Sequence, residues 1–168
     1  MMVIAVGSGE RIGRVLPELG GLLRRPLLTL ERVRICKRDG KLLCPPSALP
    51  GTDETGMPLW HKLMVYTSEA ARHDAQPVHR AIVRRLRAAG ISGATAQRGM
   101  WGFHGDHPPH GDRLLQLGRH VPVVTIVIDS PERIATAFAV VDELTAEQGL
   151  VTSETVPAMR PAGSGLPQ

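Results

Sequence analysis

Three histidines and two aspartates lie in one glycine-rich stretch, residues 99–113, which makes it the segment best equipped to bind a ligand. His104, His107 and His110 recur at every third position. Imidazole combined with carboxylate is a ligand set suited to Zn²⁺, Cu²⁺ or Ni²⁺. Two consecutive prolines after His107 favour an extended backbone, in which side chains three apart diverge. A metal site would therefore need a neighbouring subunit, and the alternative is a polar loop without metal.

The same stretch offers a second chemistry, the binding of an anion. Arg98 and Arg113 flank it, and a guanidinium group binds carboxylate or phosphate through two parallel hydrogen bonds. Gly99, Gly102 and Gly105 leave backbone N–H groups accessible, and these can cradle a phosphate where positive φ angles align them. The competing interpretation pairs each arginine with a local carboxylate such as Asp112. The sequence contains neither a P-loop nor a dinucleotide-binding glycine pattern.

Catalysis is not indicated by any arrangement of residue types, and we expect that the protein is not an enzyme. No serine or cysteine lies in a nucleophile elbow, and the candidate pairing of histidine with aspartate occurs only in the loop just described. The two cysteines, Cys36 and Cys44, have no His or Cys neighbours at metal-binding spacing. We interpret them as free reduced thiols without an assigned role, with a disulfide as the less favoured alternative.

Charge and hydropathy limit the partners. The formal net charge is +4, but residues 1–41 hold nine Lys or Arg against four acids, whereas residues 42–168 hold eleven against twelve. Because two Trp, one Tyr and two Phe leave few stacking platforms, we expect no nucleic-acid partner. No signal-like segment and no run of 18 apolar residues is present, so a cytoplasmic protein is expected.

The hydrophobic periodicity predicts the elements that position these residues. Two helices are expected, the first opened by Pro77 and ended by Gly90, the second capped by Ser130 and ended by Gly149. Their order with the strands gives a βαββαβ unit, an α+β ferredoxin-like fold with an antiparallel sheet and two helices on one face. The strands are expected at 59–66, 93–99, 121–129 and 150–156. The third is nearly all apolar, which predicts burial on both sides or an interface, and hence a homo-oligomer.

An internal repeat precedes this domain. Residues 1–35 resemble residues 124–158, with Ser8 and Ser130 in equivalent places, so a strand at 3–6, a glycine- and proline-containing helix that is short, kinked or dependent on packing, and a strand at 27–33 are expected. We favour a truncated copy over a module that adds strands to a neighbour. The predicted organisation is a partial repeat at 1–41, a Pro/Gly-rich linker at 42–58, the domain at 59–156 and a disordered tail at 157–168.

Several motifs resemble, in order, those of the domain-of-unknown-function 190 family, which is similar to PII proteins. The motifs are QPVHRAI (76–82), GISGAT (90–95), RGMWGF (98–103), HGDRLLQL (110–117) and VPVV (121–124). The resemblance implies a trimer of ferredoxin-like subunits with ligands in clefts between them. It also implies that residues 103–119 form the long signalling loop.

The resemblance further implies which ligands and partners to expect. Adenine nucleotides are common ligands of PII relatives, and copper-tolerance proteins of similar shape are linked to metals, so the cofactor stays open. Family members are often encoded beside fluoride channels, which suggests a membrane channel or transporter as partner. Two places differ from the family pattern. Trp101 stands where Glu is usual and offers an apolar plate for a base. Ala96-Gln97 stands where apolar Val-Leu is usual, and Gln97 is polar. We take Arg98, Gly99, Trp101, Gly102, Phe103, His110 and Arg113 as the ligand-binding candidates, His110 and Arg113 foremost.

Overall fold

The computed structural model describes residues 3–22, 27–47, 51–103, 110–111 and 121–158. The chain divides into two compact units, Met1–Glu31 and Arg32–Gln168. The larger unit contains every β-strand of the described chain, together with two of its helices. No helix among the described residues is long and apolar enough to cross a membrane.

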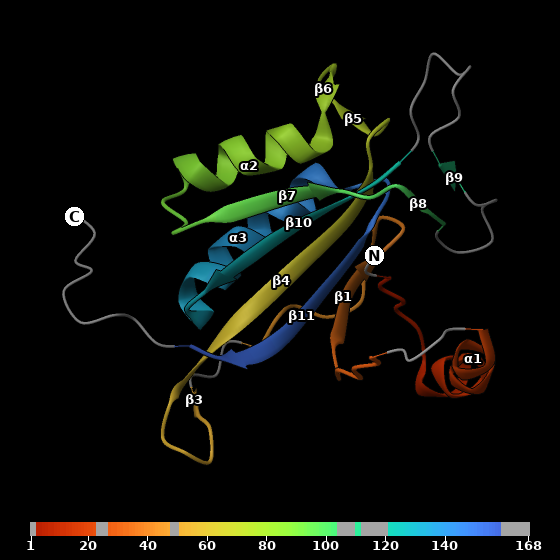
Figure 1. Ribbon diagram of the computed structural model, residues 1–168. Coiled ribbons are helices and arrows are strands. Elements are labelled where there is room, and N and C mark those ends of the chain that lie inside the picture. Colours follow the sequence, from red (N-terminus) through yellow and green to blue (C-terminus); the bar gives the residue numbers. More distant parts are fainter. Residues whose placement is uncertain (1–2, 23–26, 48–50, 104–109, 112–120, 159–168) are drawn as a thin grey trace. The chain divides into compact units, whose positions relative to one another are not determined.

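The larger unit has the predicted βαββαβ order and an antiparallel sheet, which confirms the α+β ferredoxin-like fold class (Figure 1). The four long strands lie in the order β11-β4-β10-β7, and each neighbouring pair is antiparallel. The two helices pack against each other and against the sheet through one hydrophobic core. The elements are β4 (Pro58–Ser68), α2 (Val78–Ala88), β7 (Ala94–Arg98), β10 (Pro122–Asp129), α3 (Pro131–Leu144) and β11 (Leu150–Pro157).

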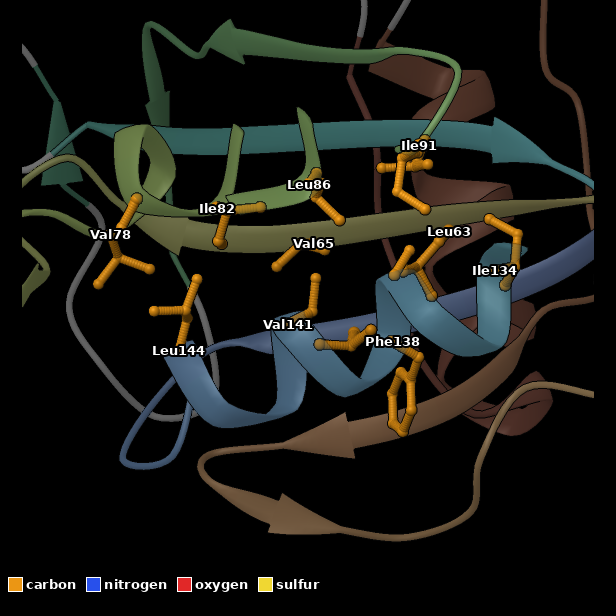
Figure 2. Packing of buried hydrophobic residues seen from close by; sticks show 14 of the residues in the cluster. Leu63, Val65, Val78, Ile82, Leu86, Ile91, Ile134, Phe138, Val141 and Leu144 are labelled. Atoms are coloured by element: carbon orange, nitrogen blue, oxygen red, sulfur yellow. The ribbon is translucent and has the colours of Figure 1, made fainter. Parts of the chain in front are cut away.

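The core lies on one face of the sheet, because alternate residues of a strand point to opposite sides. Figure 2 shows Leu63 and Val65 of β4 facing Ile82 of α2 and Val141 of α3. These side chains are fully buried. A second strand, β10, alternates in the same way, so its odd-numbered residues join the core side and its even-numbered ones the opposite face.

The opposite face of β10 is not fully buried in the single chain, so of the two predicted alternatives, burial on both sides or an interface, the first is wrong. Val124 and Ile126 are half-buried, and Ile128 is 44% exposed. The nearly continuous apolar sequence of this strand therefore supplies one core face and one apolar face that the single chain leaves partly accessible.

The two helices begin largely as expected, but α3 ends at Leu144, with Thr145 as its C-cap residue, and not at Gly149, and its N-terminal capping also differs. Ser130 is the N-cap residue, but its side chain makes no capping hydrogen bond to the helix backbone. The carboxylate of the fully buried Asp129 instead accepts hydrogen bonds from Ser130 N (2.9 Å) and Ser92 N (3.0 Å). Asp129 thereby joins the start of α3 to the turn before β7.

The smaller unit contains a helix but not the predicted strands. Residues 3–6 and 27–33 form no strand, because a strand needs a hydrogen-bonded partner and a lone half-unit offers none. The helix α1 (Gly9–Leu22) runs for 14 residues through Pro17 and buries none of its residues. It is longer than a proline and several glycines favour.

The edge of the main sheet is extended by residues that the sequence assigns to the repeat and the linker. Strand β1 (Arg34–Arg38) pairs antiparallel with β11, and β2 (Lys41–Leu42) pairs with β1. Asp39 and Gly40 join them with positive φ angles, as in a tight Asp-Gly hairpin turn. A further short strand, β3 (Gly51–Thr52), pairs with β4. The sheet therefore begins well before residue 59.

Lys37 fastens this hairpin to the helical layer. Its side chain is buried, and its Nζ donates to the Asp142 backbone carbonyl (2.6 Å) and to Asp142 Oδ1 (2.5 Å) on α3. A buried ammonium group is stable only when it is paired in this way. The edge hairpin is thus held by a specific polar contact as well as by strand pairing.

We expect Lys37→Ala to lower the free energy of unfolding by about 2 kcal/mol, because it removes both the buried stem and the partner of Asp142. Lys37→Met should lose less, since it keeps the stem. Lys41→Ala, on the exposed strand of the same hairpin, is the control and should change stability by less than about 0.5 kcal/mol. Urea denaturation measures all three, and equal effects of Lys37→Ala and Lys41→Ala would contradict the anchoring role.

Candidate anion-binding site

The sheet topology brings the ends of two strands together. Since β10 pairs antiparallel with both β4 and β7, those two strands run in the same direction. The register sets Ser68 opposite Pro122 and Arg98 opposite Val123. The strands β4 and β7 therefore end at the same edge of the sheet, one on each side of β10. Figure 1 shows the short strands β5 (Arg72–His73), β6 (Gln76–Pro77) and β8 (Trp101–Gly102) at this same end.

Charged side chains gather where these strands end. Arg98, the last residue of β7, forms an ion pair with Glu69, which follows β4. The backbone carbonyl of Glu69 accepts a hydrogen bond from Arg72 Nη1 at 2.9 Å. Arg98 therefore does pair with a carboxylate, and this one lies 29 residues away in the sequence. We call Glu69, Arg72, His79, Arg80 and Arg98 the strand-end cluster.

His79 is the least satisfied member of the strand-end cluster. It lies in the first turn of α2, and its Nδ1 atom is buried without a hydrogen-bond partner among the described residues. Burial, followed by the positive charge of Arg80, lowers the pKa of His79. Glu69 opposes this shift, whereas Arg72 and Arg98 add to it. Burial first, and the surrounding charge second, which is positive on balance, therefore favour the neutral form of the imidazole.

The helix that carries His79 adds to this positive character. No side chain caps the start of α2, and its first turn contains no acidic residue. The N–H groups of a helix start carry a partial positive charge, which anions stabilise. The N-cap residue is Pro77, whose ring has no N–H to donate. An anion at this end of the sheet would find guanidinium groups and helix N–H groups together.

The glycines after β7 have a different role from the predicted phosphate cradle. Gly99 N donates to the Pro122 carbonyl at 2.7 Å, and a Cβ on Gly99 would lie 2.7 Å from Pro122 Cγ. A Cβ on Gly102 would meet the same atom at 3.2 Å. Neither glycine has a positive φ angle, so the predicted nest does not form at these two positions. They are glycines because the chain passes close to the proline ring.

Beyond Gly99 the chain forms a ribbon with exposed apolar side chains. The strand β8 pairs antiparallel with β9 (His110–Gly111), with Gly102 opposite His110. Trp101 and Phe103 are each 68% exposed, and Met100 is 79% exposed. The predicted apolar plate at Trp101 is thus present on the surface, two positions along the chain from Gly99.

The remaining predicted ligands lie outside what the structure describes. His104, His107, Gly105 and Arg113 fall outside the described residues, and for His110 only the backbone pairing is described. Within the described chain no group of three or more His, Cys, Asp or Glu is arranged to hold a metal. The metal site on His104, His107 and His110 stays a prediction.

Sequence reasoning missed four members of the strand-end cluster: Glu69, Arg72, His79 and Arg80. His79 and Arg80 belong to the QPVHRAI stretch that supports the family resemblance, and that was the available signal. Glu69 and Arg72 carry no motif of their own. Their place depends on the register of β4 against β10.

Comparison with known proteins identifies the family of the chain. The family model of DUF190, described as Uncharacterized ACR, matches residues 60–158. The chain belongs to this family. It is also 30% identical over 95 residues to the UPF0166 protein of Aquifex aeolicus (strain VF5), an alignment that covers 56% of this chain and 88% of that protein. The matched residues begin within β4, so the edge hairpin of β1 and β2 lies outside the part that is shared.

We expect the folded protein to lose stability as the pH falls below about 6.5, the ordinary pKa of histidine. The lowered pKa of His79 means that the unfolded chain takes up a proton there before the folded one does. Burial also lowers the pKa of His61, so it should contribute in the same direction. Urea denaturation at about pH 7.5 and about pH 5.5 measures the difference. His79→Asn should reduce it, and an unchanged pH dependence would contradict the environment described.

Proposed function

We propose that this protein is a PII-like regulatory protein that binds a small anionic effector at the strand-end cluster and reports it through residues 103–119. The observation that supports this is the concentration of three guanidinium groups and one carboxylate of the strand-end cluster around the His79 imidazole. Such an excess of positive charge at the uncapped start of a helix favours an anion. We propose binding and not catalysis.

The nature of the effector follows from what surrounds the cluster. Arg72 donates to the backbone carbonyl of Glu69, and Arg98 pairs with its carboxylate. Arginine is the residue type that recognises phosphate through paired hydrogen bonds. Trp101 presents an exposed ring three positions beyond Arg98, on which a base could stack. An adenine nucleotide satisfies both requirements and is our first candidate, with Arg113 as an additional phosphate ligand.

The partly accessible sheet face supports a homotrimer. Tyr66 on β4 and Val124 on β10 are cross-strand neighbours on this face and are half-buried. Ile128 on the same face is exposed. Small domains cover such faces by assembling. In our proposal the trimer is cytoplasmic, places the effector between subunits and acts on a membrane channel or transporter.

A thermal-shift panel tests the effector. ATP, ADP, cyclic AMP, inorganic phosphate, Zn²⁺, Cu²⁺ and Ni²⁺ are added separately, each with and without a chelator. A ligand at 100 times its Kd stabilises by about 2.7 kcal/mol. We expect a chelator-resistant shift with at least one nucleotide. Arg98→Ala and Arg113→Ala should each weaken that binding by about 1.5–3 kcal/mol, the worth of a charged hydrogen bond.

Arg85→Ala is the matched control for Arg98→Ala, because Arg85 also forms an ion pair, with Glu143 at 2.6 Å, but on the outer surface of the two helices. It should leave nucleotide binding unchanged. Equal losses in both variants, or no shift with any nucleotide or phosphate, would remove the support for an anion sensor. A shift seen only with Zn²⁺, Cu²⁺ or Ni²⁺ and reversed by chelator would instead favour the histidine loop.

Light scattering tests the assembly. We expect three times the mass of the chain at micromolar concentration, and we expect Ile126→Glu, on the open sheet face, to give a monomer because a charge would be buried at the interface. Arg87→Glu, an equally drastic change on the exposed surface of α2, should leave the mass unchanged. A monomeric wild-type protein would exclude the trimer.

A further inference from the structure

The chain contains only two cysteines, and the edge hairpin brings them together. Leu43 N and Cys44 N both donate to the Cys36 carbonyl, at 2.9 and 3.2 Å, so that two residues lie opposite one. This is the geometry of a β-bulge. Residues opposite each other on antiparallel strands have the Cα separation that a disulfide spans. Two cysteines eight positions apart in the sequence are therefore direct neighbours in the fold.

The two thiols differ in access and in reactivity. Cys36 is fully buried in the core, whereas Cys44 is half-buried. Cys44 Sγ donates to the Ile35 carbonyl at 3.4 Å, while Cys36 Sγ has only a long contact, 3.8 Å, with the Arg34 carbonyl. Burial, together with the adjacent Cys44 thiol, raises the pKa of Cys36 to about 12. Cys36 is thus a protonated, shielded thiol in contact with a reachable one.

We propose that Cys36 and Cys44 form a reversible disulfide that locks the edge hairpin onto the main sheet. The bond would replace a buried S–H group that has a poor acceptor with an apolar sulfur, which suits the core around Cys36. It would also close the loop of residues 36–44, which contains the Asp39-Gly40 turn and all of β2. Closing a loop restricts the opened state of the hairpin.

The oxidant is a low-molecular-weight disulfide, for which oxidised glutathione is the probe. The Cys44 thiolate attacks one sulfur of glutathione disulfide, forming a mixed disulfide and releasing one glutathione thiolate, which takes up a proton. The sulfur of Cys36 then attacks Cys44 Sγ, the protein disulfide forms and a second glutathione leaves, taking the proton of Cys36. Two protein thiols are oxidised and one glutathione disulfide is reduced to two thiols, so atoms and electrons balance.

The experiment exposes the full-length reduced protein to oxidised glutathione and follows intact mass and free-thiol count. We expect the wild type to lose two hydrogen atoms and both free thiols, and to regain them with dithiothreitol. Cys36→Ser should stop at the mixed disulfide, with the mass of one glutathionyl group added to Cys44. Cys44→Ser should remain unmodified, because its remaining thiol is buried. Retention of both thiols in the wild type, or addition of two glutathionyl groups, would overturn the proposal.

Hydrogen exchange separates a lock from a passive cross-link. In the oxidised protein the amides of residues 35–44 should exchange more slowly, by a factor on the order of ten or more, whereas those of α2 should not change. Cys36→Ala provides a second reduced reference in case Cys36→Ser folds poorly, because a small apolar residue suits the same buried position. Equal exchange in the oxidised and reduced proteins would leave no lock and would overturn that part of the proposal.

Discussion

The arrangement of this molecule depends on the antiparallel pairing of β10 with two strands at once. Because β10 runs opposite to both β4 and β7, their last residues meet at one end of the sheet, with Ser68 and Arg98 opposite neighbouring residues of β10. The ion pair between Glu69 and Arg98 follows directly from that register. A shift by one residue would send Arg98 to the other face. The strand-end cluster is therefore a consequence of sheet topology and not of any local motif.

The parts of this fold that depend on local periodicity could be predicted from the sequence. The apolar stripe of α2 and the proline before it define that helix from sequence alone, and the helix lies where expected. Contacts that need long-range register could not be predicted, as for Glu69 and Arg98, which lie 29 residues apart. The same limit applies to Gly99, where a side chain would collide with Pro122, a residue of another strand.

The edge hairpin shows how a repeat can mislead. Residues 27–33 align with β11, so a strand was expected there, but pairing with β11 begins at Arg34. Cys36 and Lys37 are consecutive and both buried, and the register of β1 against β11 shifts between Ile35 and Lys37, which marks a bulge.

The charge balance at the end of the sheet is unfavourable for stability taken alone. Arg72, Arg80 and Arg98 lower the pKa of His79, which is to say that they repel a further positive charge there. The buried His79 Nδ1 atom has no hydrogen-bond partner among the described residues, and such a group costs about 1–3 kcal/mol. Sequences selected for stability alone avoid such local conflicts, and those that keep them generally do so at functional sites. An anion bound among these arginines would relieve the repulsion and raise the pKa of His79, so that proton uptake and effector binding would favour each other.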